Sequence, residues 1–167
     1  KGIYDKAVKT EEVLHKQSLQ VANVDNPGVF KIFQHYLKDL PNLNQVSIKE
    51  EAARIRDNSK CAEYFNNLVK AVIKSNIVLL TFNASGKTCK LVNERLHEQI
   101  DVDLFIHKCY IECARVFYNY PELFWHKFST LDIKRNQREA FILINDAIKE
   151  YIRKMLPIKL ILDEYLK

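Results

Sequence analysis

Glycine and proline are scarce in this sequence: its 167 residues include only three glycines and four prolines. This scarcity excludes a glycine-rich nucleotide-binding fold and argues against a disordered, proline-rich chain. The sequence is 47% hydrophobic and 28% charged, a balance that allows one compact core to form. We therefore predict an all-α fold, a compact multi-helix domain that covers residues 1–167 as a single unit.

Long apolar runs and concentrated charge are also lacking. No run approaches the roughly 20 apolar residues of a membrane-spanning helix, so we predict no membrane span. Lysine and arginine number 26 against 21 aspartates and glutamates, and the net charge of +5 is spread over both halves. A dedicated nucleic-acid domain concentrates its basic charge on one face. The charge therefore predicts only weak attraction to polyanions.

Cysteine is limited to four residues: Cys61, Cys89, Cys109 and Cys113. A domain of this size does not need disulfides, and Cys109 and Cys113 are spaced as neighbours on one helix. This usage indicates a reducing compartment. The sequence starts with Lys-Gly and has no initiator methionine, so we expect an excised domain or a processed product.

Apolar periodicity and capping residues predict helices along most of the chain. The expected helices cover residues 3–22, 27–40 with Asn26 as the N-cap and Pro27 at the first helical position, a segment that starts at the capping box Ser47-Ile48-Lys49-Glu50, one capped by Asn58-Ser59, 102–119 capped by Asp101, and 132–156. Residues 77–92 leave two structures open. They fit either a small β-hairpin or a helix end followed by a turn and a new helix.

The same periodicity predicts which side chains face the core. In the segment after Asn58-Ser59, we expect Phe65, Leu68, Val69, Val72 and Ile73 to be inward. In the last long helix, the residues expected to be inward are Phe141, Ile144, Ile148, Ile152 and Met155, which recur at i, i+3 and i+4.

Two patterns imitate catalytic or metal sites. Ser85-Gly86-Lys87-Thr88 resembles the end of a phosphate-binding loop, but Thr81 stands where its first glycine belongs. Cys109 and Cys113 near His107 suggest zinc, yet the second closely spaced ligand pair is missing, and buried cysteines pack as small hydrophobes. We predict that the chain is not an enzyme and has no catalytic residue, no metal site and no cofactor.

Aromatic, basic and terminal apolar side chains are the candidates for binding a partner. Packing within the domain and docking on a partner both remain open for the apolar ones. The basic ones suit carboxylates or phosphates, but interleaved Glu and Asp disfavour direct nucleic-acid binding. The candidate partner-binding residues are Phe124, Trp125, Phe128, Lys134, Arg135, Arg138, Arg153, Lys154, Ile158, Ile161, Leu162 and Tyr165.

Four segments of the second half form a recognisable series. They run from Ile106 to Arg115, from Asn119 to Phe124, from Arg135 to Glu139, and from Ile152 to Leu166. In this order they resemble an uncharacterised C-terminal-type domain of large nucleocytoplasmic DNA virus proteins, in the African swine fever virus, mimivirus and marseillevirus group. The resemblance covers residues 101–166 and does not place residues 1–100.

This resemblance implies a viral protein that acts in the cytoplasm of an infected cell, in the viral factory, or in the virion. Its members are associated with virions, capsid architecture or packaged transcription machinery, and no catalytic residues are established for them. We therefore expect a non-enzymatic structural or docking module whose partners are other viral proteins, such as capsid components. The alternative is an accessory factor of viral RNA polymerase or other nucleic-acid machinery.

Overall fold

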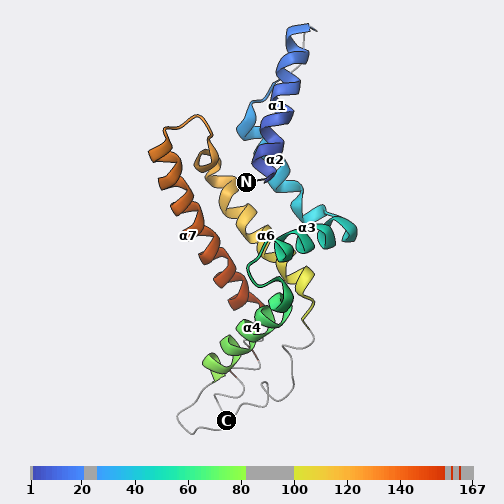
Figure 1. Cartoon of the computed structure of the whole chain (residues 1–167), viewed down its shortest axis with the longest axis vertical. Helices are drawn as coiled ribbons and strands as arrows, with labels where there is room; N and C mark the ends of the chain where they lie inside the picture. The colour runs from blue at the N-terminus through green and yellow to red at the C-terminus, as the bar shows by residue number, and fades with distance from the viewer. Residues whose placement is uncertain (1, 21–25, 82–99, 157–158, 160–161, 163–167) are drawn as a thin grey trace. The chain divides into compact units, whose positions relative to one another are not determined.

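The computed structural model describes residues 2–20, 26–81, 100–156, 159 and 162. These residues form helices joined by turns and short 3₁₀ segments and contain no strand, which confirms the predicted all-α class for this part of the chain (Figure 1). The α-helices are α1 (Gly2–Gln20), α2 (Val29–Asp39), α3 (Gln45–Asp57), α4 (Phe65–Thr81), α6 (Val102–Asn119) and α7 (Thr130–Met155).

The chain divides into two compact units, each built from two separate stretches of sequence. Unit 1 comprises Lys1–Leu43 and Tyr110–Ile148, and unit 2 comprises Asn44–Cys109 and Lys149–Lys167. Both unit boundaries in the second half fall inside a helix, one in α6 and one in α7. The start of the viral resemblance at residue 101 therefore does not coincide with a unit boundary, and the organisation as a single domain stays a prediction.

Unit 1 has a core of aromatic and small side chains. On α1, Tyr4 and Ala7 are 2% and 0% exposed, and α2 adds Phe33 at 3%. Burying a side chain of the size of Phe33 stabilises a fold by about 1.5–3 kcal/mol. The complete buried cluster contains Tyr4, Ala7, Ile32, Phe33, Leu37, Leu40, Ala114, Phe117 and Ala140. It therefore draws on α1, α2, α6 and α7.

Unit 2 has a more aliphatic interior. Ile73 of α4 is 1% exposed, and Ala52 of α3 is also 1% exposed. The rings of Phe105 and Tyr151 lie 5.6 Å apart and join the first part of α6 to the last part of α7. The buried hydrophobic residues of this unit are Ile48, Ala52, Ile73, Val102, Phe105, Ile106, Cys109, Ile152 and Leu156.

Helix α3 starts and ends differently from the prediction. It begins at Gln45, because the Oδ1 atom of Asn44 accepts a hydrogen bond from the backbone N–H of Ser47 at 2.8 Å. Ser47 is therefore inside the first turn and is not the cap. Asn58, expected to open the next helix, instead closes α3, and α4 begins only at Phe65.

Helix α2 begins later than predicted. Its first residue is Val29, and the preceding Gly28 has a φ of 83°, a conformation that glycine adopts without steric cost. Asn26 does not cap the helix directly. Its Oδ1 accepts a hydrogen bond from the N–H of Gly28 at 3.1 Å, which forms a side-chain turn ahead of the helix.

The hairpin considered for residues 77–92 is wrong for its first strand, because residues 77–81 continue α4. Residues 82–92 lie outside the described residues, and these include the segment 85–88 that resembles the end of a phosphate-binding loop.

Two of the expected core residues of α4 face outward: Leu68 is 44% exposed and Val72 is 42% exposed. Helix α4 thus buries a narrower face, centred on Ile73.

Helix α7 confirms the long C-terminal helix, but one residue of its predicted inward face is exposed and two alanines outside that prediction are buried. Phe141, expected in the core, is 66% exposed, whereas the small residues Ala140 and Ala147 are buried. Ile152 is buried as predicted, at 7% exposure. In unit 1, α7 therefore buries Ala140 and Ala147, packs Leu143 and, as predicted, Ile144 partly buried against the core, and presents Phe141 and Ile142 to solvent.

Candidate functional site

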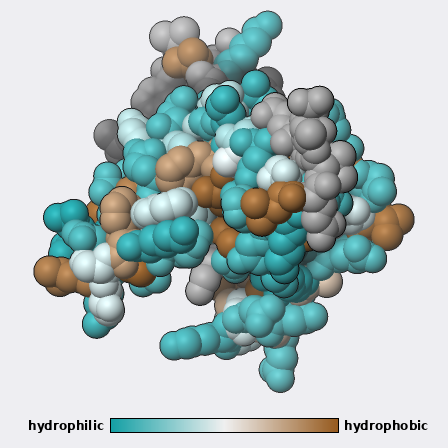
Figure 2. Space-filling model, turned by 90° about the horizontal axis from the view of Figure 1, so that it is seen from above, coloured by the Kyte–Doolittle hydropathy of each residue, from teal (hydrophilic) through white to brown (hydrophobic). Residues whose placement is uncertain are grey.

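The outward side of the first half of α7 carries three exposed large apolar side chains, none of which is among the predicted partner-binding residues. Leu131, Phe141 and Ile142 are 78%, 66% and 50% exposed. Exposed hydrophobic residues appear in brown among teal hydrophilic ones in Figure 2. Single exposed hydrophobic residues are ordinary, but several on one helix face point to an interaction surface.

Three of the predicted basic candidates lie on the same segment of α7. Lys134, Arg135 and Arg138 are all exposed. The guanidinium of Arg135 pairs with Asp132 at 2.9 Å, and that arginine side chain is still 74% exposed. We call the exposed surface formed by these residues the α7 outer face. It consists of Leu131, Lys134, Arg135, Arg138, Phe141 and Ile142.

The aromatic candidates lie just before α7, in the connection that contains the 3₁₀ segment η4 (Pro121–Phe124). The ring of Phe124 lies 4.9 Å from that of Phe117 and 5.3 Å from that of Phe33. Trp125 contacts Phe30 at a ring separation of 5.2 Å. Both rings are thus engaged by their own unit. Phe128 is different, because it is 41% exposed.

A hydrogen bond fixes the same connection against α1. The hydroxyl of Tyr4 lies 3.1 Å from Nδ1 of His126. Burial raises the pKa of the Tyr4 hydroxyl, and the nearby Asp5 adds to the rise, so this group stays protonated at neutral pH. The geometry gives this pair a structural role, since it holds the connection in place beneath the aromatic rings.

Of the remaining candidates, the three that the structure describes belong to unit 2. Arg153 and Lys154 belong to the stretch of α7 assigned to unit 2, where Arg153 pairs with Glu150 at 3.6 Å. Leu162 is helical and 53% exposed. Ile158, Ile161 and Tyr165 lie outside the described residues.

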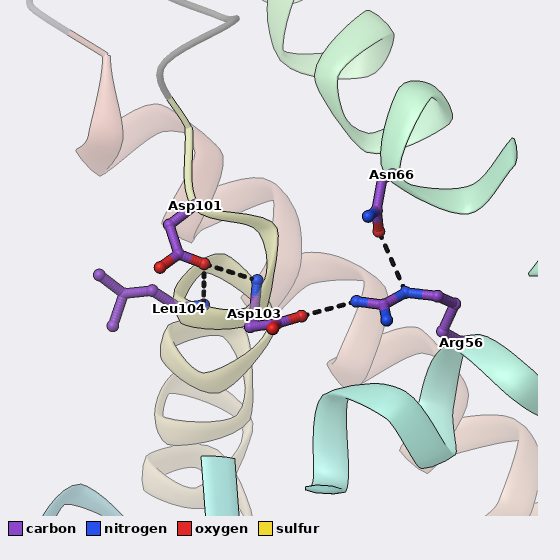
Figure 3. A network of polar contacts seen from close by, with 5 residues as sticks. All are labelled: Arg56, Asn66, Asp101, Asp103 and Leu104. Carbon is purple, nitrogen blue, oxygen red and sulfur yellow. Dashed lines mark hydrogen bonds and ion pairs between the residues drawn. The ribbon is translucent and has the colours of Figure 1, made fainter. Parts of the chain in front are cut away.

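Unit 2 contains a polar network that joins three helices (Figure 3). The Nη2 atom of Arg56 on α3 donates to Asp103 of α6 at 2.6 Å, and its Nε donates to Asn66 of α4 at 3.1 Å. The side chains of Arg56 and Asp103 are 26% and 28% exposed, so solvent screens this ion pair only in part. Sequence reasoning missed this network because its members are far apart in the chain.

The start of α6 lies beside this network and follows the prediction. The Oδ1 atom of Asp101 accepts hydrogen bonds from the backbone N–H groups of Asp103 and Leu104 at 3.0 and 3.1 Å (Figure 3). This is the geometry of an N-cap. Asp101 and Asp103 therefore act in fold stabilisation. Farther along α6, Glu112 pairs with Arg115 at 2.5 Å.

Two of the residues that suggested zinc, Cys113 and His107, have environments that favour their uncharged forms. Burial raises the pKa of the Cys113 thiol to about 11, with the Glu112 carboxylate as the second cause. Burial, followed by the positive charge of Lys108, lowers the pKa of His107. Among the described residues, no three His, Cys, Asp or Glu side chains form a group that could hold a metal ion.

Comparison with known proteins identifies a family. A model of a family of unknown function, DUF5764, matches residues 1–125. The chain belongs to the DUF5764 family. The match includes residues 1–100, which the viral resemblance does not place, and it ends at Trp125, before α7 begins. No curated protein and no solved structure matches this DUF5764 chain significantly.

No helix in the described part of the chain has both the length and the apolar character needed to cross a membrane.

Proposed function

We propose that the chain is a non-enzymatic docking module of a large DNA virus protein, associated with the virion or capsid, that binds another protein through the α7 outer face. One observation carries this proposal: Leu131, Phe141 and Ile142 are at least half exposed on a single helix. Covering such side chains by a partner removes apolar surface from water, which is the main favourable contribution to protein association.

The viral setting rests on a separate argument, the resemblance of residues 101–166 to the domain of large nucleocytoplasmic DNA virus proteins. It extends the proposal to capsid components as partners and to the viral factory or virion as the location. The α7 outer face lies within these residues, so the segment that suggests the setting also contains the proposed docking surface.

A second function is favoured by the charge of the same face. Lys134, Arg135 and Arg138 lie within two turns of α7 and are exposed. An accessory factor of viral RNA polymerase, in contact with nucleic acid, would use such side chains on phosphates. This alternative predicts binding that weakens steeply with salt, whereas apolar docking predicts salt-tolerant binding.

The test is crosslinked capture of the full-length protein from infected cells after nuclease treatment. One variant carries Leu131→Ser, Phe141→Ser and Ile142→Ser. A matched control carries Val13→Ser and Val46→Ser, which change side chains that are 54% and 64% exposed on other helices. We expect capsid neighbours to be lost with the first variant and retained with the control. Loss of polymerase subunits instead would support the second function, and identical neighbours for both variants would exclude docking through α7.

A further inference from the structure

The α7 outer face has a defined arrangement of apolar and basic groups. At about 100° per residue, Leu131, Arg138 and Ile142 project within about 40° of one direction, and buried Ala140 and Ala147 project on the opposite side. Lys134 and Phe141 lie together on one flank of this line, about 60–80° from its centre. The basic groups thus lie between apolar side chains at the two ends.

The basic groups of this face are available to a partner. No side chain in the described part of the chain pairs with Lys134 or Arg138. Arg135 pairs with Asp132 and remains largely exposed. Arginine presents a planar fork of N–H donors that matches a carboxylate, so Arg135 and Arg138 suit glutamate or aspartate side chains.

From this arrangement we propose that the α7 outer face binds an acidic, amphipathic helix of a partner protein. The inference rests on the proposed docking function and specifies its partner. Leu131 and Ile142 are about 17 Å apart along the helix axis, the length of three helical turns. A partner helix with apolar residues at i, i+3 or i+4 and i+7, and with carboxylates beside them, complements both the spacing and the charge.

Two other kinds of surface fit this face less well. An interfacial membrane helix keeps its basic residues on the side opposite its apolar residues, but here Arg138 lies in the middle of the apolar line. A nucleic-acid surface favours continuous basic charge, but α7 also carries Asp132, Glu139, Asp146 and Glu150. The exposed Leu131 and Ile142 have no role against phosphates. Charge and apolar pattern together therefore favour the protein helix.

The first step of the test identifies what touches the face. A benzophenone amino acid replaces Ile142 in the full-length protein, and a control protein carries it in place of Val46, which is 64% exposed in unit 2. After photocrosslinking in infected cells, mass spectrometry maps the attached segment. We expect a segment with the acidic amphipathic pattern from position 142 and not from position 46.

The second step measures the charge contacts with a synthetic peptide that copies the crosslinked segment. The double variant Lys134→Glu, Arg138→Glu should weaken binding at least tenfold, and a peptide with lysine in place of its glutamates should restore it. The control Lys9→Glu, Lys16→Glu makes the same charge change at exposed positions of α1 in unit 1 and should leave binding within about twofold. Circular dichroism confirms that each variant is folded.

The outcomes separate the two proposals. If position 142 crosslinks specifically to a protein segment that is neutral or basic, docking through α7 stands and the acidic-helix inference is overturned. A crosslink to lipid or nucleic acid alone, or equal peptide affinity for both charge-reversed variants, overturns the inference as well. If position 142 yields no crosslink above that from position 46, the docking function itself is wrong.

Discussion

Two neighbouring parts of unit 1 contain large apolar side chains but differ in what covers them. In the connection before α7, Phe124 and Trp125 pack against rings of α2 and α6. On α7 itself, Leu131 and Phe141 are mostly exposed, and the packing against the core comes from Ala140 with the partly buried Leu143 and Ile144. Residue type does not distinguish these two parts. A large apolar side chain is therefore a candidate for docking only where no other residue of the same chain packs over it.

The largest expected effect comes from truncating Phe33, the buried α2 residue against which the connection packs, and comparing the result with truncation of Phe141 on α7. Phe33 is 3% exposed, with the rings of Tyr4 and Phe124 both 5.3 Å away. Phe33→Ala should lower the free energy of unfolding by about 3–5 kcal/mol, because it removes buried surface and leaves a cavity. Phe141→Ala should change it by less than about 0.5 kcal/mol. Urea unfolding followed by circular dichroism measures both, and equal losses would mean that Phe141 is not a solvent-facing residue.

The next largest effect concerns the reactivity of the Cys113 thiol, which packs against the unit 1 core. The pKa of Cys113 is raised to about 11 from 9.0, so at pH 8 its reactive thiolate should be roughly a hundredfold less abundant than for an unperturbed thiol. Alkylation by iodoacetamide, followed by peptide mass spectrometry, should show correspondingly slow labelling of Cys113. The protein unfolded in urea is the control and should label at the ordinary rate. Fast labelling of the folded protein would show that the thiol is solvated.

A comparison of arginines extends the argument to charge. Arg56 has two partners within unit 2, whereas Arg138 has none in the described part of the chain. Arg56→Ala should lower the free energy of unfolding by about 1.5–3 kcal/mol, since it leaves a half-buried Asp103 without its charged donor. Arg138→Ala should leave stability within about 0.5 kcal/mol. Thermal and urea unfolding test the pair, and a stability loss in Arg138→Ala would indicate an internal role for that residue.

The smallest effect concerns pH. The pKa of His107 is lowered below its ordinary 6.5 by burial and by Lys108, so the unfolded chain takes up a proton more readily than the folded one. The stability contributed by neutral His107 is therefore complete above pH 6.5 and declines as the pH falls below it. Replacement by glutamine should reduce this decline. His15→Gln, at an exposed position of α1, is the control, and equal pH profiles for the two variants would contradict the prediction.

Features that depend on neighbouring residues could be predicted from the sequence, because they need no long-range packing. The scarcity of glycine and proline predicted helices, and Asp101 predicted the start of α6. Asn44 was overlooked as a cap because Ser47-Ile48-Lys49-Glu50 has the spacing of a capping box one turn later. The capping signals at α3 and α6 are both local. Where two possible caps lie within one turn, as Asn44 and Ser47 do, the sequence does not decide between them, and the folded structure shows that Asn44 is the cap.

Burial was harder to predict, because it depends on which side of a helix meets another element. Lys134, Arg135 and Arg138 were recognised as candidates from their spacing, but Phe141 was placed in the core because a single apolar stripe was assumed along all of α7. The helix in fact buries the small residues Ala140 and Ala147 in unit 1, beside the partly buried Ile144, and Ile152 in unit 2. Alanine is a weak signal in an apolar pattern, so the buried side was assigned to the larger Phe141.

The discontinuous composition of unit 1 affects how the chain folds during synthesis. Its α1 and α2 leave the ribosome first, but the residues that complete their core, Ala114, Phe117 and Ala140, follow only after all of α3 and α4. At about 5–20 residues per second, Tyr4 and Phe33 remain incompletely covered for several seconds. A nascent chain of this kind offers an apolar surface to chaperones before it offers the α7 outer face to a partner.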